Sequence, residues 1–193
     1  MNKIILASGS PRRKELLEQA DIEFEVIVSD SDESYMATKP EMIVEEISRG
    51  KAEAVVSTLE REEFTLLAAD TVVCFENVIY GKPYDAEDAF NMLKKLQGNT
   101  HKVVTGVTIA TKRKNSETAY KSFHETTEVE VYAMTDEEIR AYIATGEPMD
   151  KAGSYAIQGK YAKFIKNIHG SCSNVVGLPI GRVYHELYEI KNT

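Results

Sequence analysis

Residues 3–14 read Lys-Ile-Ile-Leu-Ala-Ser-Gly-Ser-Pro-Arg-Arg-Lys, an apolar run that passes through a small polar turn into a basic segment. The run at residues 3–7 is typical of a short buried strand. Ser10 followed by Pro11 is typical of a helix start, because serine caps the first turn and proline lacks the N–H group that would stay unbonded there. A buried strand that leads directly into a helix indicates an α/β protein.

The rest of the chain continues to alternate helix and strand patterns. Apolar residues at helical spacing, preceded by capping residues, predict further helices that begin near Pro40, Asp85, Thr135 and Pro179. Apolar or alternating runs predict strands at residues 65–75, 78–80, 101–111 and 117–133. The last two flank a polar turn and form a predicted hairpin, so we expect a mixed sheet in place of an all-parallel one. No linker rich in proline, glycine or serine occurs, and we expect residues 1–193 to form a single domain.

The composition narrows the classes of ligand. The length of 193 residues suits one domain, and the shares of hydrophobic (42%) and charged (28%) residues are those of a globular protein. Thirty-one acidic against 23 basic residues give a net charge of −8, which argues against general binding to nucleic acid or to an anionic membrane surface. An anionic ligand must therefore meet a local cluster of positive charge.

The cysteines and the apolar runs indicate the compartment. Cys74 and Cys172 lie far apart without Cys-x-x-Cys spacing, so neither a disulfide framework nor a thiolate zinc site is expected. The apolar run at the start is too short for a signal peptide, and no run approaches the roughly 20 apolar residues of a membrane span. We expect a soluble protein in the reducing cytoplasm.

The turn at residues 8–13 is the first candidate site. Backbone N–H groups and the positive end of the helix dipole converge there, which suits a phosphate. Arg12, Arg13 and Lys14 occupy the first turn, where a helix built for stability alone favours acids, and a bound anion would supply the missing negative charge. The alternative is a basic surface turn tolerated at a cost of a few tenths of a kcal/mol. The Gly-x-x-x-x-Gly-Lys-Ser/Thr phosphate loop is absent.

Acidic residues form the second candidate. Asp70 lies within an apolar strand, so its carboxylate must be hydrogen-bonded, paired, metal-bound or open to a cleft. It is either a structural aspartate or, on a rigid strand, a ligand for a hard metal or a general base. Asp30, Asp32 and Glu33 form either a solvated loop or, through Glu33 together with Asp70, a Mg²⁺ site.

Three further polar residues have unusual positions. Lys51 lies on the apolar stripe of its predicted helix and must either extend to solvent or meet an anion. Lys82 lies in the turn Gly81-Lys82-Pro83, which alone is weak evidence. Gln158 is the lone amide in a stretch of small residues at 150–159, which is either a tight loop or a surface that reads the edge of a base. The four histidines share no metal-ligand spacing, and no motif of a serine or cysteine nucleophile is present.

Five blocks of sequence resemble the signature blocks of the Maf family, and they run in family order from residue 5 to residue 179. They are residues 5–13, 69–73, 81–83, 150–153 and 174–179. The resemblance implies a nucleoside triphosphate pyrophosphatase, also called a diphosphatase, that cleaves between the α and β phosphates. It also implies an α/β fold with a mixed, elongated, twisted sheet flanked by helices, and two lobes with a central cleft, similar to inosine-triphosphate pyrophosphatases.

Within that family, the branch that acts on dTTP and UTP resembles this chain best, because it carries glutamine in the block that ends at Ile157-Gln158-Gly159. By this likeness Arg12, Thr71 and Gln158 set substrate choice, and Asp70 is the proton acceptor. Departures from the family pattern occur at Ser154, Ala156 and Ser171-Cys172, and these bear on fine substrate preference rather than on the reaction.

The residues and the resemblance lead to one hypothesis. The substrate-binding residues are Ser8, Ser10, Arg12, Arg13, Lys51, Thr71, Lys82 and Gln158. Glu33 and Asp70 hold a divalent cation, Mg²⁺ or alternatively Mn²⁺, and Asp70 takes a proton from the attacking water. The expected partner is a nucleoside triphosphate, without nucleic acid or membrane, and a homodimer is common in the family. The competing hypothesis is a non-catalytic nucleotide sensor that regulates septum formation and cell division.

Overall fold

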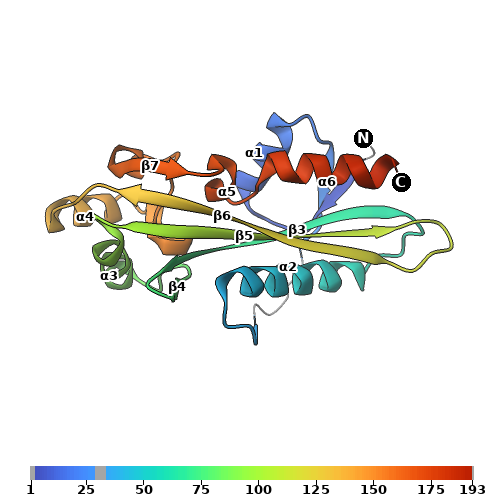
Figure 1. Cartoon of the computed structure of the whole chain (residues 1–193), viewed down its shortest axis with the longest axis horizontal. Coiled ribbons are helices and arrows are strands. Elements are labelled where there is room, and N and C mark those ends of the chain that lie inside the picture. The colour runs from blue at the N-terminus through green and yellow to red at the C-terminus, as the bar shows by residue number, and fades with distance from the viewer. Residues whose placement is uncertain (1–2, 29–33, 193) are drawn as a thin grey trace. The chain divides into compact units, whose positions relative to one another are not determined.

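Strands and helices follow each other along the chain largely as predicted (Figure 1). The computed structural model describes residues 3–28 and 34–192. The strands are β1 (Ile4–Leu6), β2 (Phe24–Val26), β3 (Phe64–Phe75), β4 (Val78–Tyr80), β5 (Thr100–Lys112), β6 (Ala119–Val131) and β7 (Ile165–His169). The α-helices are α1 (Pro11–Gln19), α2 (Pro40–Val56), α3 (Ala86–Leu96), α4 (Asp136–Ile143), α5 (Cys172–Val176) and α6 (Ile180–Asn192). Short 3₁₀ helices are η1 (Glu147–Asp150), η2 (Ala152–Ser154) and η3 (Lys160–Phe164).

The predicted mixed sheet is confirmed. The strands lie in the order β2-β1-β3-β5-β6-β7, and β4 pairs with β3. Strand β1 runs parallel to both β2 and β3, whereas β4 is antiparallel to β3 and β7 is antiparallel to β6. The parallel pairs follow from the crossover helices, since parallel neighbours need a long connection, and the antiparallel pair β3–β4 needs only the turn Glu76-Asn77. Both turn residues have positive φ (51° and 63°), as a tight hairpin turn requires.

The local signals at α3 and α4 are also confirmed. The Asp85 side chain accepts a hydrogen bond from the Asp88 amide at 2.8 Å. The predicted capping box forms, because the Thr135 hydroxyl accepts from the Glu138 amide (3.2 Å) and the Glu138 carboxylate accepts from the Thr135 amide (2.9 Å).

None of the described helices is long and apolar enough to cross a membrane.

The predicted cap of α1 is wrong in one respect. Ser10 occupies the capping position, but its side chain makes no capping hydrogen bond. Its backbone amide instead donates to the Ser8 hydroxyl at 3.3 Å. Pro11 still begins the helix, although no side-chain cap from Ser10 accepts from its first amides.

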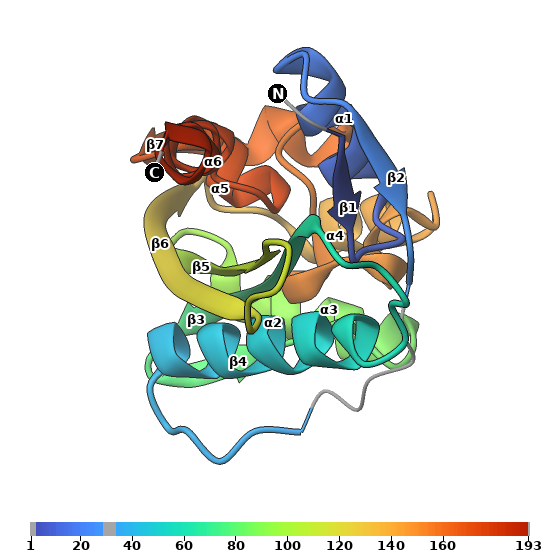
Figure 2. The same ribbon diagram turned by 90° about the vertical axis from the view of Figure 1, so that its right-hand side faces the viewer.

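The chain divides into two compact units, and β3, β5 and β6 contribute residues to both. The first unit consists of Met1–Asp70, Thr105–Glu125 and Gly177–Thr193. Its strands have α2 on one face and α6 on the other (Figure 2). An apolar cluster packs α2 against β1 and β3, and it contains Ile5, Ala7, Ala52, Val55, Leu66, Ala68 and Ala110.

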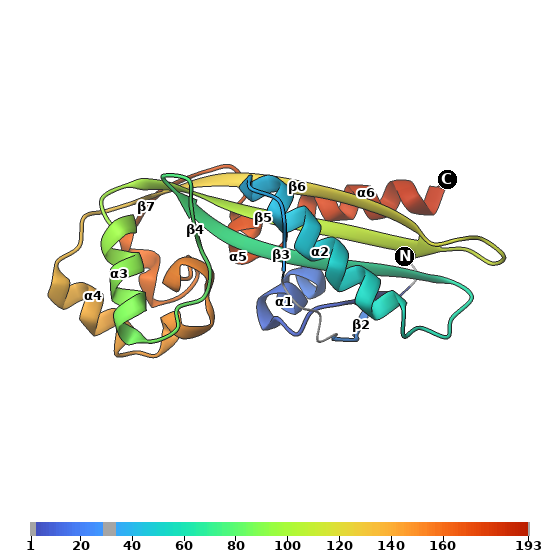
Figure 3. The same ribbon diagram turned by 90° about the horizontal axis from the view of Figure 1, so that it is seen from below.

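The second unit consists of Thr71–Val104 and Thr126–Val176. Helices α3 and α4 lie beside each other in it (Figure 3). Its core joins these helices to the 3₁₀ segments through an aromatic cluster, which contains Phe90, Tyr142, Tyr155, Tyr161 and Phe164. This core supports the stretch at residues 150–159 that carries Gln158.

Candidate active site

The turn after β1 is held together by its own polar side chains. Ser8 is only 7% exposed, and its hydroxyl accepts a hydrogen bond from Arg13 Nη1 at 2.9 Å. Arg13 Nε donates to the carbonyl oxygen of Gly177 at 2.8 Å, which ties the turn to the segment before α6. These contacts give Arg13 a structural reason to lie in the first helical turn. Its binding to phosphate stays a prediction.

The start of α1 retains the character of an anion site. The first turn of the helix contains no acidic residue of its own that could neutralise the positive end of the helix dipole. Ser10 and Arg12 are partly exposed on this turn. A phosphate at the helix start would therefore find backbone donors and the Arg12 guanidinium on one surface.

Lys51 and Asp70 form an ion pair. The sequence around each residue did not indicate that the two side chains are partners. Lys51 Nζ lies 2.7 Å from Asp70 Oδ1, and the two side chains are 17% and 13% exposed. Asp70 shares the face of β3 that packs against α2, because it alternates with Leu66 and Ala68. The lysine on the apolar stripe of α2 thus meets an anion, which decides between the two alternatives left by the sequence.

Asp70 and the basic turn both lie beyond the carboxyl end of β1. Leu6 of β1 is the register partner of Leu67 of β3, and the amide of Ala7 donates to the Leu67 carbonyl at 2.8 Å. Asp70 follows three residues further along β3, about 10 Å at the usual rise of a strand. Ser8 therefore follows the carboxyl end of β1, and Asp70 lies further along the parallel neighbour β3 in the same direction, which is the side on which α/β proteins bind ligands.

The second unit brings together two other predicted site regions. The Gly153 amide donates to the Gly81 carbonyl at 3.0 Å, which places the turn that carries Lys82 beside the stretch at 150–159. Gly153 has a φ of +65°, and a Cβ there would lie 2.7 Å from Val73 Cγ2, so only glycine allows this stretch to approach β3. Thr71, two residues before Val73, is partly exposed on the same strand.

Lys82 and Gln158 are both exposed. Within the described part of the chain, neither side chain takes part in a hydrogen bond or ion pair. Tyr155, three residues before Gln158, is buried, and its hydroxyl lies 2.6 Å from His101 Nε2. Burial lowers the pKa of His101 to about 4, so this imidazole is neutral at pH 7. Gln158 thus extends from a stretch that is anchored in the core.

The predicted metal site is only partly within the described residues. Glu33, with Asp30 and Asp32, lies outside them. Among residues 3–28 and 34–192, no group of three or more His, Cys, Asp or Glu side chains could hold a metal ion. A Mg²⁺ ion in proteins is often held by one or two carboxylates together with substrate phosphates, and Asp70 fits that pattern.

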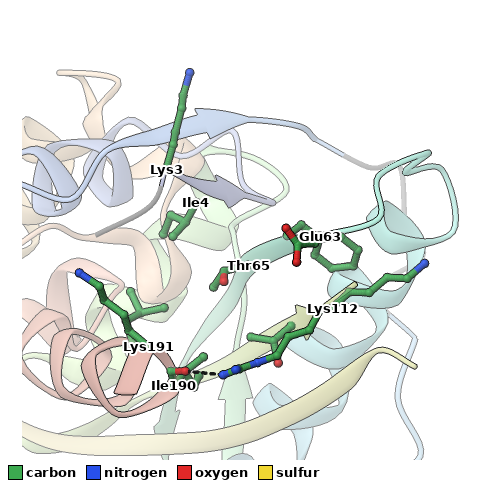
Figure 4. Close-up of a pocket in the computed structure, with 11 residues that line it drawn as sticks. Lys3, Ile4, Glu63, Thr65, Lys112, Ile190 and Lys191 are labelled. Atoms are coloured by element: carbon green, nitrogen blue, oxygen red, sulfur yellow. Dashed lines mark hydrogen bonds between the residues drawn. The ribbon is translucent and has the colours of Figure 1, made fainter. Parts of the chain in front are cut away.

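A cavity of about 460 Å³ lies elsewhere in the first unit (Figure 4). Ile4 and Thr65, near the starts of β1 and β3, line it, whereas Ser8 follows the end of β1 and Asp70 lies five residues after Thr65 along β3. The ammonium groups of Lys3, Lys112 and Lys191 point in different directions around it. This cavity is therefore separate from the candidate active site.

Sequence reasoning missed the residues that support the site. Glu147 accepts hydrogen bonds from the Tyr142 hydroxyl and from the Lys160 amide, and it thereby contacts the chain on the carboxyl side of Gln158. In the sequence, Glu147 lies between Gly146 and Pro148. It belongs to no periodic pattern, so nothing there indicates its hydrogen-bond partners.

The mixed sheet, the basic turn at α1 and the Lys51–Asp70 pair define an α/β protein with a candidate site made of cationic side chains and a carboxylate. The chain belongs to the Maf family, since the family model described as Maf-like protein matches residues 3–190. The resemblance inferred from the five sequence blocks is thereby confirmed.

Similar proteins match over nearly the whole chain. A dTTP/UTP pyrophosphatase of Agathobacter rectalis is 48% identical over 201 residues, which cover 98% of each chain. A dTTP/UTP pyrophosphatase of Bacillus cytotoxicus is 51% identical over 188 residues, which cover 97% of this chain and 95% of the relative. The solved structure of a HAM1 protein from Coxiella burnetii is 17% identical, covers 98% of this chain and 100% of that one, and has a TM-score of 0.45.

Proposed function

We propose that this protein is a nucleoside triphosphate pyrophosphatase that hydrolyses dTTP and UTP to the nucleoside monophosphate and pyrophosphate. Relatives with about half of their residues identical over nearly full length carry that name. The observation that carries the proposal is the Lys51–Asp70 pair, which lies beyond the same end of β1 as the basic turn. A carboxylate and a phosphate-binding surface at one strand end are what the reaction requires.

In the proposed reaction the oxygen of a water molecule attacks the α phosphorus, and the bond from that phosphorus to the α–β bridging oxygen breaks. Asp70 accepts the proton of the water, and pyrophosphate leaves with the bridging oxygen. The amides of the turn at 8–13, with Arg12, Arg13 and Lys82, bind the phosphates. Lys51 fixes the orientation of the Asp70 carboxylate through the 2.7 Å contact.

We also propose a divalent cation as cofactor, Mg²⁺ or Mn²⁺, held by Asp70 and Glu33. Hard carboxylate oxygens suit these ions, and substrate phosphates would complete the coordination. When bound, the cation neutralises phosphate charge and lowers the pKa of a coordinated water.

Removal of divalent cations is expected to stop the reaction. In a pyrophosphate-release assay with dTTP, an excess of EDTA lowers the rate by at least about 100-fold, and added Mg²⁺ restores it. A rate that EDTA leaves unchanged would contradict the metal proposal. Nucleotide binding without turnover, with Mg²⁺ or Mn²⁺ present, would contradict the enzyme and favour the sensor of septum formation.

Replacing Gln158 with glutamate is expected to weaken the recognition of pyrimidine triphosphates more than that of other nucleotides. The amide both donates and accepts hydrogen bonds, whereas a carboxylate only accepts, so the donor toward the base is lost. The kcat/KM for dTTP and UTP should fall about 10- to 100-fold, and that for dATP by less than about twofold. Gln19→Glu, the same change at an exposed position in α1, serves as the control. An equal loss on every nucleotide would make Gln158 structural.

We propose the cytoplasm as the place of action. Cys74 and Cys172, both within the described residues, form no disulfide, which suits a reducing compartment. A homodimer, as expected from the family resemblance, remains a proposal that the molar mass in solution tests.

A further inference from the structure

The chain on either side of Gln158 is held by a small polar cluster in the second unit. This cluster consists of Tyr142 at the end of α4 and Glu147 at the start of η1. Tyr142 is 4% exposed, and its hydroxyl donates to Glu147 Oε1 at 2.9 Å. Burial and this hydrogen bond raise the pKa of Tyr142, so its hydroxyl stays protonated and acts as the donor.

The cluster contacts the carboxyl side of Gln158 through the Glu147 carboxylate. Glu147 Oε2 accepts a hydrogen bond from the Lys160 amide at 3.0 Å. Gly159 lies directly against the same carboxylate, since a Cβ at this glycine would lie 2.2 Å from Oε1 and 2.6 Å from Oε2. The backbone at 159–160 therefore rests on Glu147 without an intervening side chain.

The tyrosine faces the amino side of Gln158. The backbone of Ala156 lies close enough to the Tyr142 hydroxyl to lower its pKa, against the larger effects of burial and Glu147. A set of hydrogen bonds thus runs from Tyr142 through Glu147 to Lys160, and the backbone of Ala156 lies beside its tyrosine end, so the set has contacts on both sides of Gln158. Glu147 itself is fixed at its carbonyl oxygen, which accepts from Lys151 Nζ at 2.7 Å.

We propose that Glu147 is a positioning residue for nucleobase selection: its carboxylate and the Tyr142 hydroxyl fix the segment at 156–160 so that the Gln158 amide meets the base at one orientation. The proposal rests on the proposed function of Gln158 and goes beyond it, because Glu147 acts through the backbone and does not touch the nucleotide. Its effect should therefore depend on which base is bound.

The substitution Glu147→Gln tests the hydrogen bonds of Glu147 separately from its packing. The side chain keeps its size, but one of the two acceptor oxygens becomes an NH₂ group that only donates. If that group faces the Lys160 amide, two donors oppose each other. If it faces the Tyr142 oxygen, the tyrosine proton loses its acceptor in a buried site. Either arrangement weakens the hydrogen-bonded connection across Gln158, because one donor is left without an acceptor.

The test measures dissociation constants and turnover for dTTP and dATP with the wild-type protein, Glu147→Gln and the control Glu130→Gln, whose side chain pairs with exposed Lys166 in the same unit. The expected result for Glu147→Gln is about tenfold weaker binding of dTTP with less than about twofold change for dATP, so that the loss appears in KM rather than in kcat. In a Gln158→Ala background Glu147→Gln should add less than about twofold. Tyr142→Phe removes the hydroxyl that donates to Glu147. It should also raise the ratio of the dissociation constant for dTTP to that for dATP.

Equal losses on both nucleotides, or a full additive loss in the Gln158→Ala background, would overturn the proposal. Thermal unfolding of each variant shows whether it is folded, and if Glu147→Gln does not fold, the ratio measured for Tyr142→Phe decides. A wild-type protein that binds dTTP without turnover would overturn the proposed function, while the ratio of dissociation constants would still judge the role of Glu147.

Discussion

Asp70→Asn is expected to lower kcat for pyrophosphate release from dTTP by about 1000-fold, within the range that loss of a general base produces. Asparagine has the same shape as aspartate, so packing against α2 is retained. It cannot accept the proton of the attacking water, and a neutral amide is a poorer ligand for a divalent cation. It also leaves the Lys51 ammonium, which is 17% exposed, without its carboxylate partner. Steady-state kinetics with saturating Mg²⁺ measure the effect.

Asp136→Asn is the matched control, because Asp136 also pairs with a lysine, Lys94, but at an exposed site. Its kcat should stay within about twofold of the wild type, since exposed ion pairs contribute little. Asp70→Asn with activity within threefold of wild type would remove Asp70 from the chemistry. Lys51→Met separates the roles further: if Lys51 acts by orienting Asp70, adding Lys51→Met to Asp70→Asn should cost little more.

Local chemistry in the sequence predicted much of the fold. Asp85 and Thr135 cap their helices as expected, because a capping residue and its N–H partner lie within three residues of each other. Ser10 occupies the capping position of α1 without a side-chain capping bond, and the polar contacts of that turn are made by the Ser8 hydroxyl, which accepts from the Ser10 amide and from Arg13. Elements of three to five residues, such as β2 and α5, are too short to show a period.

The candidate site could be predicted as a set of residues but not as a set of contacts. Asp70 and Lys51 were each conspicuous because a charge in an apolar pattern needs a partner. That they are each other's partner depends on the packing of α2 on β3. Glu147 gave no such signal, because its partners lie among 3₁₀ turns without periodic patterning and its hydrogen bond to Lys160 spans 13 residues.

Gly106→Ala is expected to destabilise the protein strongly, because a side chain at Gly106 of β5 would displace α2, the helix that carries Lys51. A Cβ at Gly106 would lie 2.3 Å from the carbonyl carbon and oxygen of Val44 and 2.7 Å from the amide nitrogen of Glu45. These are backbone atoms of α2, which cannot rotate away as a side chain can. The helix must shift as a whole, and we expect the free energy of unfolding to fall by about 3–5 kcal/mol in urea denaturation.

Gly50→Ala, in the same helix α2, is the matched control. It should raise the free energy of unfolding, whereas Gly106→Ala lowers it. A Cβ at Gly50 would meet nothing within 4 Å, and alanine favours a helix over glycine by about 0.5–1 kcal/mol. The folded fraction of Gly106→Ala should also have a lower kcat, because a displaced α2 moves Lys51 away from Asp70. A loss of stability below about 1 kcal/mol would mean that α2 does not lie against β5 at Val44. Normal stability with normal kcat would also remove the support for Lys51 as the residue that orients the proposed base.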